Sequence, residues 1–384
     1  GEIHHRGVKS SCPLNDIPYF NIIENCINDV MHTVLEGVIP YVMGAVLHAI
    51  SQLCARVTVE TINQRILQVF GTLIVDRYNK PCLLNKLLPA GAGMSPKQSA
   101  AKQWALFRYM PLLIGELIEG DEAIEYWELF LVLEEIVDIL MASRFTDALL
   151  VYLSDRTETL LFLFKSRFPL LPIRPKLHFL LHAPRIIKKN GPMRLYWCMT
   201  YERKNGSVKL PSHTMRNFIN PQQTISYRCQ CATLNCLIQN KNNRSLVTVY
   251  SSGPISVCET IRNAINFELL SSLSCEMESV ETADKVDING TEYRKGTFVT
   301  VNHDEQGYLF GQIEFIICEN LDEPFLFLSL YSTLEFDAKT HTYCIKRKAD
   351  FSNQIVRVSH LLDHHPLDTV QHNARFHIRL KYRI

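Results

Sequence analysis

The hydrophobic positions between residues 26 and 165 recur with the spacing of helices. In "DVMHTVLEGVIPYVMGAVLHAISQL", which begins at Asp29, apolar residues stand at i, i+3, i+4 and i+7, with no alternation of the strand type. Segments with the same character begin at Thr58, Ser95, Asp121 and Phe145. We therefore predict an all-helical domain over residues 26–168, after an extended lead-in over residues 1–25 that is punctuated by Pro and Asn.

Capping signals give the expected ends of several helices. Thr58, with Thr61 as the alternative, is suited to cap one helix, and Pro96 after Ser95 is suited to the first position of the next. A further helix is expected from about 175 to 189, because Asn190-Gly191-Pro192 is a typical C-terminal stop.

After residue 288 the apolar period changes to two. "TEYRKGTFVTVNHDEQGYLFGQIEFIICEN" reads as strands separated by turns, and short strand-like segments continue to the C-terminus. We predict a small all-β barrel or sandwich over 288–384, a polar linker over 241–287, and a separate segment over 169–240. The fold class is then α+β, with several domains.

The composition is that of an ordinary globular protein and does not by itself indicate a function. Of the 384 residues, 47% are hydrophobic and 21% charged, and the net charge of +1 gives no global field for nucleic acid or membrane. We find no apolar run of the roughly 18 residues that a membrane span needs, and no secretory signal. The twelve cysteines include no C-x2-C pair, which favours the reduced thiols of an intracellular protein. A first residue of Gly1 suggests a fragment or a processed product.

His178 and His182 are the first candidates for a metal site. Four residues apart on a helix, they project from one face and could share a tetrahedral zinc ion. Such a site needs two more ligands, which the neighbouring sequence does not supply. The alternative is a core helix with two ordinary histidines.

Glu202 is a lone acid in the apolar and aromatic segment "LYWCMTYERK", 20 residues after His182. As a ligand for a divalent ion it would need at least one further carboxylate, because magnesium takes oxygen ligands. The alternative is an ion pair with a neighbour such as Arg203.

Two weaker candidates remain. In "INDVMHTVLEG", Asp29 could be an N-cap, or it could join His32 and Glu36 in a metal site. Cys229 and Cys231, with the third thiol at position 236, could also bind metal; C-x-C spacing is poor for one zinc, so buried thiols are favoured.

Basic residues gather between positions 174 and 209. Nine cations lie within these 36 residues, which suggests contacts with phosphate groups, against the alternative of a solvated helix face. The residues proposed for DNA contact are Lys188, Lys189, Arg194, Arg203 and Lys204.

Several blocks occur in an order that resembles a known family. "GVKSSCPLNDIPYF…DVMHTVLEGVIPYVM", "SAAKQWALFRYMPLLIG" and "KLHFLLHAPRIIKKNGPM…WCMTYERK" are similar, over about residues 7–210, to the C-terminal half of animal CACTA (En/Spm) type DNA transposases. The β region ending in "LKYRI" is also similar to the tail of those proteins. This group is related to the catalytic subunit of the V(D)J recombinase.

The resemblance implies an RNase H-like core with three metal-binding acids and an all-helical insertion between the second and the third. Residues 26–168 would be the insertion, and 169–240 the remnant of the core with Glu202 as the third acid. His178 and His182 would be half of a structural zinc site. The first two acids and a C-x2-C pair are then expected upstream of Gly1, and the complete enzyme would use Mg²⁺ or Mn²⁺.

The function expected from this resemblance is a fragment of a DDE-type transposase. The complete protein would cleave transposon ends and transfer strands in the nucleus, with DNA as its partner, as a homo-oligomer and without a membrane. The fragment alone would be inactive. The alternative is a domesticated, non-enzymatic module that binds DNA or protein through a chromatin-type barrel. Its aromatic candidates are Tyr293, Phe298, Tyr308 and Phe310, for which core packing is the competing interpretation.

Overall fold

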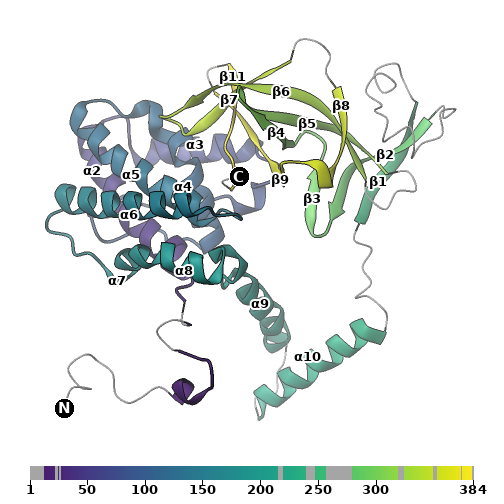
Figure 1. Ribbon diagram of the computed structural model, residues 1–384, viewed down its shortest axis with the longest axis horizontal. Helices are drawn as coiled ribbons and strands as arrows, with labels where there is room; N and C mark the ends of the chain where they lie inside the picture. Colours follow the sequence, from purple (N-terminus) through teal and green to yellow (C-terminus); the bar gives the residue numbers. More distant parts are fainter. Residues whose placement is uncertain are drawn as a thin grey trace.

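The computed structural model describes residues 13–21, 25, 27–214, 219–238, 247–256, 279–318, 324–348, 353–372 and 374–382. These residues form a group of helices and one antiparallel sheet that lies beside them (Figure 1). The mixed α+β class predicted from the sequence is confirmed. Most of the predicted lead-in over 1–25 lies outside the described residues.

The helical part runs from residue 13 to residue 238. After a single turn, η2 (Pro13–Asp16), its elements are η3 (Met31–Val38), α2 (Ile39–Leu53), α3 (Val59–Thr72), η4 (Arg77–Asn79), α4 (Ala100–Ile114), η5 (Gly115–Leu117), α5 (Asp121–Leu140), α6 (Asp147–Arg167), α7 (Pro175–His178), η6 (Phe179–His182), α8 (Ala183–Asn190), η7 (Met193–Leu195), α9 (Met199–Thr214) and α10 (Pro221–Ile238). The described part of 169–240 is helical or irregular and contains no strand. Helices α9 and α10 extend away from the others (Figure 1).

The continuous helix formed by η3 and α2 is the centre of the helical core. Its apolar side chains are almost all below a few per cent exposed, and they pack against α4 and α5. By length and composition, Met31–Leu53 could also cross a membrane, with a mean hydropathy of 1.5, which corrects the count of apolar runs made from the sequence. Of the most apolar 18-residue stretch in this helix, 67% is buried within the protein, as expected for the core helix of a helical bundle.

Several predicted helix ends agree with the structure. Thr58 caps α3, accepting a hydrogen bond from the backbone N–H of Thr61 at 3.1 Å, and Gly191 follows α8 with φ +81°. The helix predicted from Ser95 begins instead at Ala100. The Ser95 carbonyl accepts a hydrogen bond from the Asn85 N–H at 3.0 Å, so this segment pairs with an extended neighbour.

The helix predicted from 175 to 189 is divided into α7, η6 and α8. Pro184 stands at the start of α8, where it has no N–H to donate to the preceding turn. The 3-10 turn η6 therefore separates α7 from α8, and His178 and His182 lie at its two ends.

The sheet contains eleven strands, and all its pairs are antiparallel. They are β1 (Val247–Ser256), β2 (Ser279–Ile288), β3 (Thr291–Arg294), β4 (Phe298–Asp304), β5 (Gly307–Ile317), β6 (Phe325–Asp337), β7 (Thr342–Arg347), β8 (Asn353–Arg357), β9 (Asp363–Leu367), β10 (Thr369–His372) and β11 (Arg375–Ile378), with the turn η8 (Val358–His360) after β8.

The strand order runs β1-β2-β5-β6-β7-β11-β10, while β3, β4 and β8 pair beside this path and β9 pairs with β4. Most of the linker predicted over 241–287 lies outside the described residues; the described part forms β1 and most of β2, which pair along nearly their whole length. The alternation in "VTVYSSGPIS" is interrupted by Gly253 and Pro254, which hid this strand from the period-two pattern.

The C-terminal strands pack directly on the helices. The Asp368 carboxylate, between β9 and β10, accepts hydrogen bonds of 2.7–3.0 Å from the N–H groups of Ile74, Val75 and Asp76. Tyr382 reaches the helical core, where its ring lies 5.5 Å from that of Trp104. The C-terminal segment therefore contacts the helical core, and the sheet also has apolar clusters of its own.

Buried charges join the two parts as well. Arg379, after β11, donates to Glu134 at 3.2 Å and to Asp138 at 2.6 Å, both on α5. Next to the Asp368 clamp, Arg108 of α4 pairs with Asp76, and both side chains are about 95% buried or more. Burial raises the pKa of Asp76, but Arg108 outweighs it and holds that pKa below its usual value. Removing one partner of such a pair leaves an uncompensated buried charge.

Replacing Asp368 with Ala should destabilise the whole protein, because three backbone N–H groups lose their acceptor. At about 1 kcal/mol or more for each unsatisfied donor, we expect a loss of at least about 3 kcal/mol in the free energy of unfolding, measured by urea titration. Glu305→Ala, in an exposed turn of the same sheet, should change it little. Equal effects of the two substitutions would contradict this role of Asp368.

Candidate functional site

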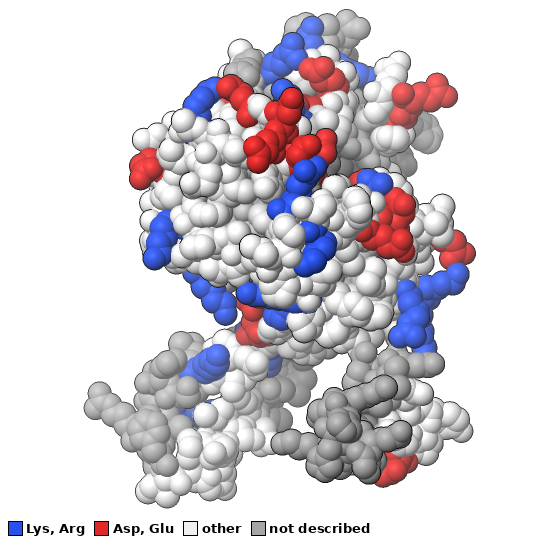
Figure 2. All heavy atoms as spheres, turned by 90° about the vertical axis from the view of Figure 1, so that its left-hand side faces the viewer, with Lys and Arg blue, Asp and Glu red and all other residues white. Residues whose placement is uncertain are grey.

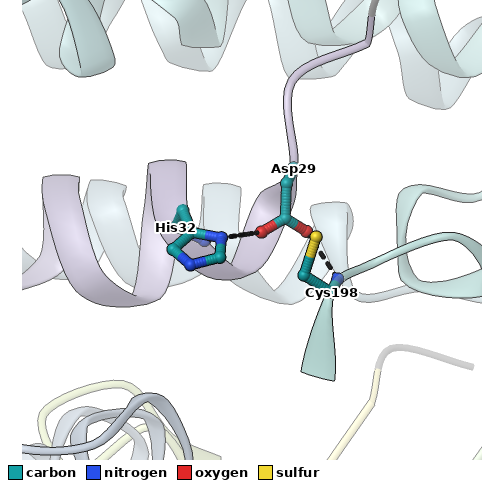
Figure 3. A group of neighbouring side chains, drawn as sticks. All are labelled: Asp29, His32 and Cys198. Atoms are coloured by element: carbon teal, nitrogen blue, oxygen red, sulfur yellow. Dashed lines mark hydrogen bonds and ion pairs between the residues drawn. The ribbon is translucent and has the colours of Figure 1, made fainter. Parts of the chain in front are cut away.

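Asp29 and His32 lie together at the start of the first long helix. The Asp29 carboxylate accepts hydrogen bonds from the His32 backbone N–H at 2.9 Å and from the ring Nδ1 at 2.6 Å through the same oxygen, Oδ2. This backbone bond has the i, i+3 spacing of an N-cap bond, and Asp29 stands directly before Val30, the residue that precedes η3. It also fixes the His32 ring against the carboxylate (Figure 3).

Glu202 approaches the same imidazole from the other side. It lies in the first turn of α9, and its Oε1 is 3.1 Å from His32 Nε2. One ring therefore stands between two carboxylates that are 173 positions apart in the sequence (202 − 29). The exposed fractions of the side chains are 18% for Asp29, 45% for His32 and 54% for Glu202, so the group is open to solvent on the Glu202 side.

Cys198 completes the group. Its backbone N–H donates to Asp29 Oδ1 at 2.8 Å, and its thiol lies beside that carboxylate (Figure 3). One ligand atom each from Asp29, His32 and Cys198 lie within 4.8 Å of one another. The sequence analysis did not select Cys198; its position four residues before Glu202 was the only signal.

The hydrogen bonds set the charge state of the group. Burial raises the pKa of Asp29, but the N–H groups of His32 and Cys198 outweigh it and bring that pKa below its ordinary value. Burial and the neighbouring Asp29 carboxylate raise the pKa of the Cys198 thiol. At neutral pH the site therefore has an ionised Asp29 and a protonated thiol.

These donors can hold a divalent cation. The carboxylates of Asp29 and Glu202 are the ligand type that Mg²⁺ and Mn²⁺ prefer, whereas the imidazole and the thiol suit zinc-like ions. An ion held by Asp29 and Glu202 would replace the hydrogen bonds that now run through His32. Glu202 is not among the residues whose ligand atoms lie within 4.8 Å of one another, so one ion could bind both carboxylates only after the His32 ring moved out from between them.

His178 and His182 lie apart from this group. Both are exposed, and their ring centroids are 5.1 Å apart with the planes at 84°. They share one face, as their spacing predicts. Among the described residues no Cys, Asp, Glu or third His brings a ligand atom into a group with them. The two histidines thus fit a zinc ion as half of a site only.

The remaining metal candidates do not assemble. Glu36 lines a neighbouring cavity. Helix α10 carries Cys229, Cys231 and Cys236 but has no buried residue, and the last two of these thiols are exposed. The prediction of buried thiols there is wrong, because α10 extends away from the core and, among the described elements, packs mainly against α9.

The proposed DNA contacts are dispersed. Lys188 pairs with Asp147 at 2.9 Å, and the Arg194 guanidinium stacks on the Tyr382 ring at 3.9 Å, inside the junction of helices and sheet. Lys189, Arg203 and Lys204 are exposed. On the face seen in Figure 2, charges of both signs stand in small groups with uncharged surface between them. Among the residues described there, no continuous basic surface covers that face.

A second cluster was missed by the sequence analysis. In "DHHPL" of β9, Asp363 Oδ1 is 2.7 Å from His365 Nδ1, and the two adjacent imidazole rings are 3.9 Å apart. Two consecutive histidines after an acid were a usable signal. Arg194 lies close enough to lower the pKa of His364, after burial, and its positive charge disfavours a metal cation there.

Comparisons with protein-family models, with curated proteins and with solved structures give no match for this chain.

Substituting Asp29 with Ala should lower the free energy of unfolding by about 1 kcal/mol at neutral pH, the usual contribution of an N-cap. Because the folded-state pKa lies below 3.8, this contribution is present above that pH and is lost as the pH falls through the folded value. Urea unfolding across this range should show the difference between wild type and variant shrinking with acid. The exposed control Glu158→Ala should show no such trend; a difference independent of pH would contradict the assignment.

Proposed function

We propose that the chain is part of a DDE-type DNA transposase and that Asp29 and Glu202 are two of its three metal-binding acids. The observation that carries the proposal is the contact of both carboxylates with one imidazole, at 2.6 Å and 3.1 Å from His32. Two acids far apart in sequence are thereby brought to one point on the surface.

The position of Asp29 along the chain supports this choice. In the resembling family the helical insertion separates the second acid from the third. Asp29 lies two residues before the start of η3, where the long helices begin, and Glu202 lies in the first turn of α9, after the short helices α7, η6, α8 and η7. We therefore revise the expectation that two acids lie upstream of Gly1: only the first is sought there, and Asp29 is the second.

The chemistry proposed is metal-dependent cleavage of a phosphodiester. The bound Mg²⁺ or Mn²⁺ would activate water and stabilise the leaving oxygen. Asp29 is held ionised and oriented by two backbone N–H groups, so it is ready to bind a cation. His32 joins the two carboxylates through its two ring nitrogens. Glu202, on the exposed side, is placed where DNA can approach.

The remaining fold, zinc site, partners and location are proposed from the same resemblance. The RNase H-like core would have these acids on either side of the helical insertion, and His178 with His182 would supply half of a zinc site. DNA, a second copy of the protein and the nucleus are the proposed partners and location. With two of three acids in its described site, we propose that the chain binds the ion without cleaving DNA.

Mn²⁺ binding tests the assignment of the two acids. In titrations followed by electron paramagnetic resonance, Asp29→Asn and Glu202→Gln should each weaken binding by about tenfold or more, since each removes a charged oxygen ligand. Glu36→Gln, two turns along the same helix, is the matched control and should bind as the wild type does. Unchanged binding in both test variants would refute the proposal.

Incubation of the 384-residue chain with duplex DNA and Mg²⁺ is the companion readout. We expect no nicking above background. Strong nicking that Glu202→Gln abolishes would mean that this chain completes the active site by itself.

A second candidate function, a binding module, is favoured by one observation on the sheet. A cavity of about 340 Å³ between α5 and the sheet is lined by Tyr308, Phe336 and Tyr343, and by the acids Glu135 and Asp138. Arg379 also lines it and pairs with Asp138 at 2.6 Å, so Glu135 is the acid left to attract a cation. Aromatic faces with nearby carboxylates attract methylated ammonium groups. Of the other aromatic candidates, Tyr293, Phe298 and Phe310 are at most 2% exposed and serve as core.

If this cavity is functional, the chain should bind a peptide that carries trimethyllysine more tightly than the same peptide with unmodified lysine. Phe336→Leu keeps an apolar side chain but loses the ring, so it should reduce that preference several-fold in calorimetric titrations. Leu334→Ala, exposed on the same strand, is the control. No preference for the methylated peptide in the wild type would remove this candidate.

A further inference from the structure

A cavity of about 630 Å³ lies next to the Asp29–His32 group, in the helical part. Its walls come from the continuous helix of η3 and α2, from the loop that precedes α4 and the start of α4 itself, and from the segment around α7. This volume is typical of sites for small molecules. The cavity shares a wall with the candidate metal centre, since Lys176 of its lining donates to the His32 carbonyl at 2.7 Å.

Two glycines shape this cavity. A Cβ at Gly37 would clash with the Lys176 side chain, so the glycine leaves room for that lysine along the wall. Gly93, with φ +87°, belongs to the loop "GAG" that approaches α2 so closely that a Cβ at Gly44 would clash with it. The sequence therefore keeps the loop against the helix and the wall open.

The charge of the lining is positive. Lys97, Arg174 and Lys176 line the cavity, and Glu36 is the one acid among its described lining residues, which gives +3 − 1 = +2. Arg174 donates to the Gly91 carbonyl at 2.7 Å. Like the bond from Lys176, this contact is to a neutral carbonyl and does not cancel the charge. The cavity thus favours an anionic ligand.

One buried side chain in the wall has an unused donor. Gln103, on α4, is 2% exposed, and its amide Nε2 has no hydrogen-bond partner among the described residues. Gln98, in the same wall, differs: its amide makes two hydrogen bonds of 2.9 Å with the backbone of Cys82. A buried amide without a partner calls for an explanation, and a ligand acceptor in the cavity supplies one.

The rest of the wall is apolar and partly aromatic. Tyr41 and Phe179 line it with Leu35, Met94 and Leu177, and the Arg174 guanidinium stacks on the Tyr41 ring at 4.1 Å. Flat apolar and guanidinium surfaces are the surroundings in which single nucleobases stack. The cavity therefore joins a surface for a planar ring with cations for an anion.

We propose that this cavity binds one nucleotide. The base lies among the apolar side chains with an acceptor atom facing Gln103 Nε2, and the phosphate is held by Lys97, Arg174 and Lys176. The inference rests on the proposed function in one respect only, the source of the nucleotide. In a transposase, this source is an unpaired nucleotide of a DNA strand that lies beside the metal centre. A free mononucleotide has the same chemistry, and the experiment distinguishes the two sources.

The test measures binding of the four deoxynucleoside 5′-monophosphates, and of a short single-stranded oligonucleotide, to the full chain. Gln103→Leu and Arg174→Gln should each weaken binding about tenfold, as expected for the loss of one ligand hydrogen bond in a closed site. Gln52→Leu and Arg144→Gln, both exposed and remote from the cavity, are the matched controls. The melting temperature of Gln103→Leu should fall little, because Gln103 Nε2 donates no hydrogen bond to the described residues.

Saturable binding of mononucleotides supports the site for free and strand-borne nucleotides alike, and binding of the oligonucleotide alone assigns the strand as the source. No saturable binding of either, binding that both substitutions leave unchanged, or inorganic phosphate binding as tightly as a nucleotide would overturn the inference. The Asp29→Asn/Glu202→Gln double variant should still bind nucleotides. This separates failure of the cavity from failure of the metal centre.

Discussion

The carboxylate of Asp29 accepts hydrogen bonds from two segments that the sequence separates by most of the helical part. One oxygen binds the backbone and ring of His32, and the other binds the N–H of Cys198, 169 positions further along. The start of the first long helix and the start of α9 are thus joined at one side chain. Glu202 meets His32 only because α9 begins at this point.

The C-terminal end of the chain supports the segment that leads into Cys198 and α9. Arg194, four residues before Cys198, stacks on Tyr382, and Tyr382 packs on Trp104 of the helical core. Trp104 is in turn 6.1 Å from the Trp197 ring, directly before Cys198. The sheet therefore supports the segment that carries the candidate site, although it contributes no ligand to it. Loss of the sheet would therefore change the position of Glu202, because these ring contacts support the start of α9.

The sequence predicts local features well where local physics decides them. The helical period, the Thr58 and Gly191 caps and the shared face of His178 and His182 depend on neighbours within a few residues. The start of α4 does not, because Ser95 pairs with a distant segment, and β1 was hidden by its internal Gly253 and Pro254.

The contacts that assemble the site depend on tertiary packing, and no spacing encodes them. Asp29 was considered as a cap or as a metal ligand with His32 and Glu36, whereas the structure brings Glu202 of α9 to the His32 ring. Cys198 and Gln103 carry no motif at all: the first is placed by its backbone N–H, the second by burial without a partner. No family model, curated protein or solved structure matches this chain. The proposed identity is therefore supported by the quoted motifs and by this geometry.

The most direct measurement is the anomalous scattering of Mn²⁺ in crystals of the chain. The account predicts one peak within bonding distance of carboxylate oxygens of both Asp29 and Glu202, with the His32 ring coordinated or turned aside. A peak bound elsewhere, or electron density in which α9 carries Glu202 away from Asp29, would contradict it.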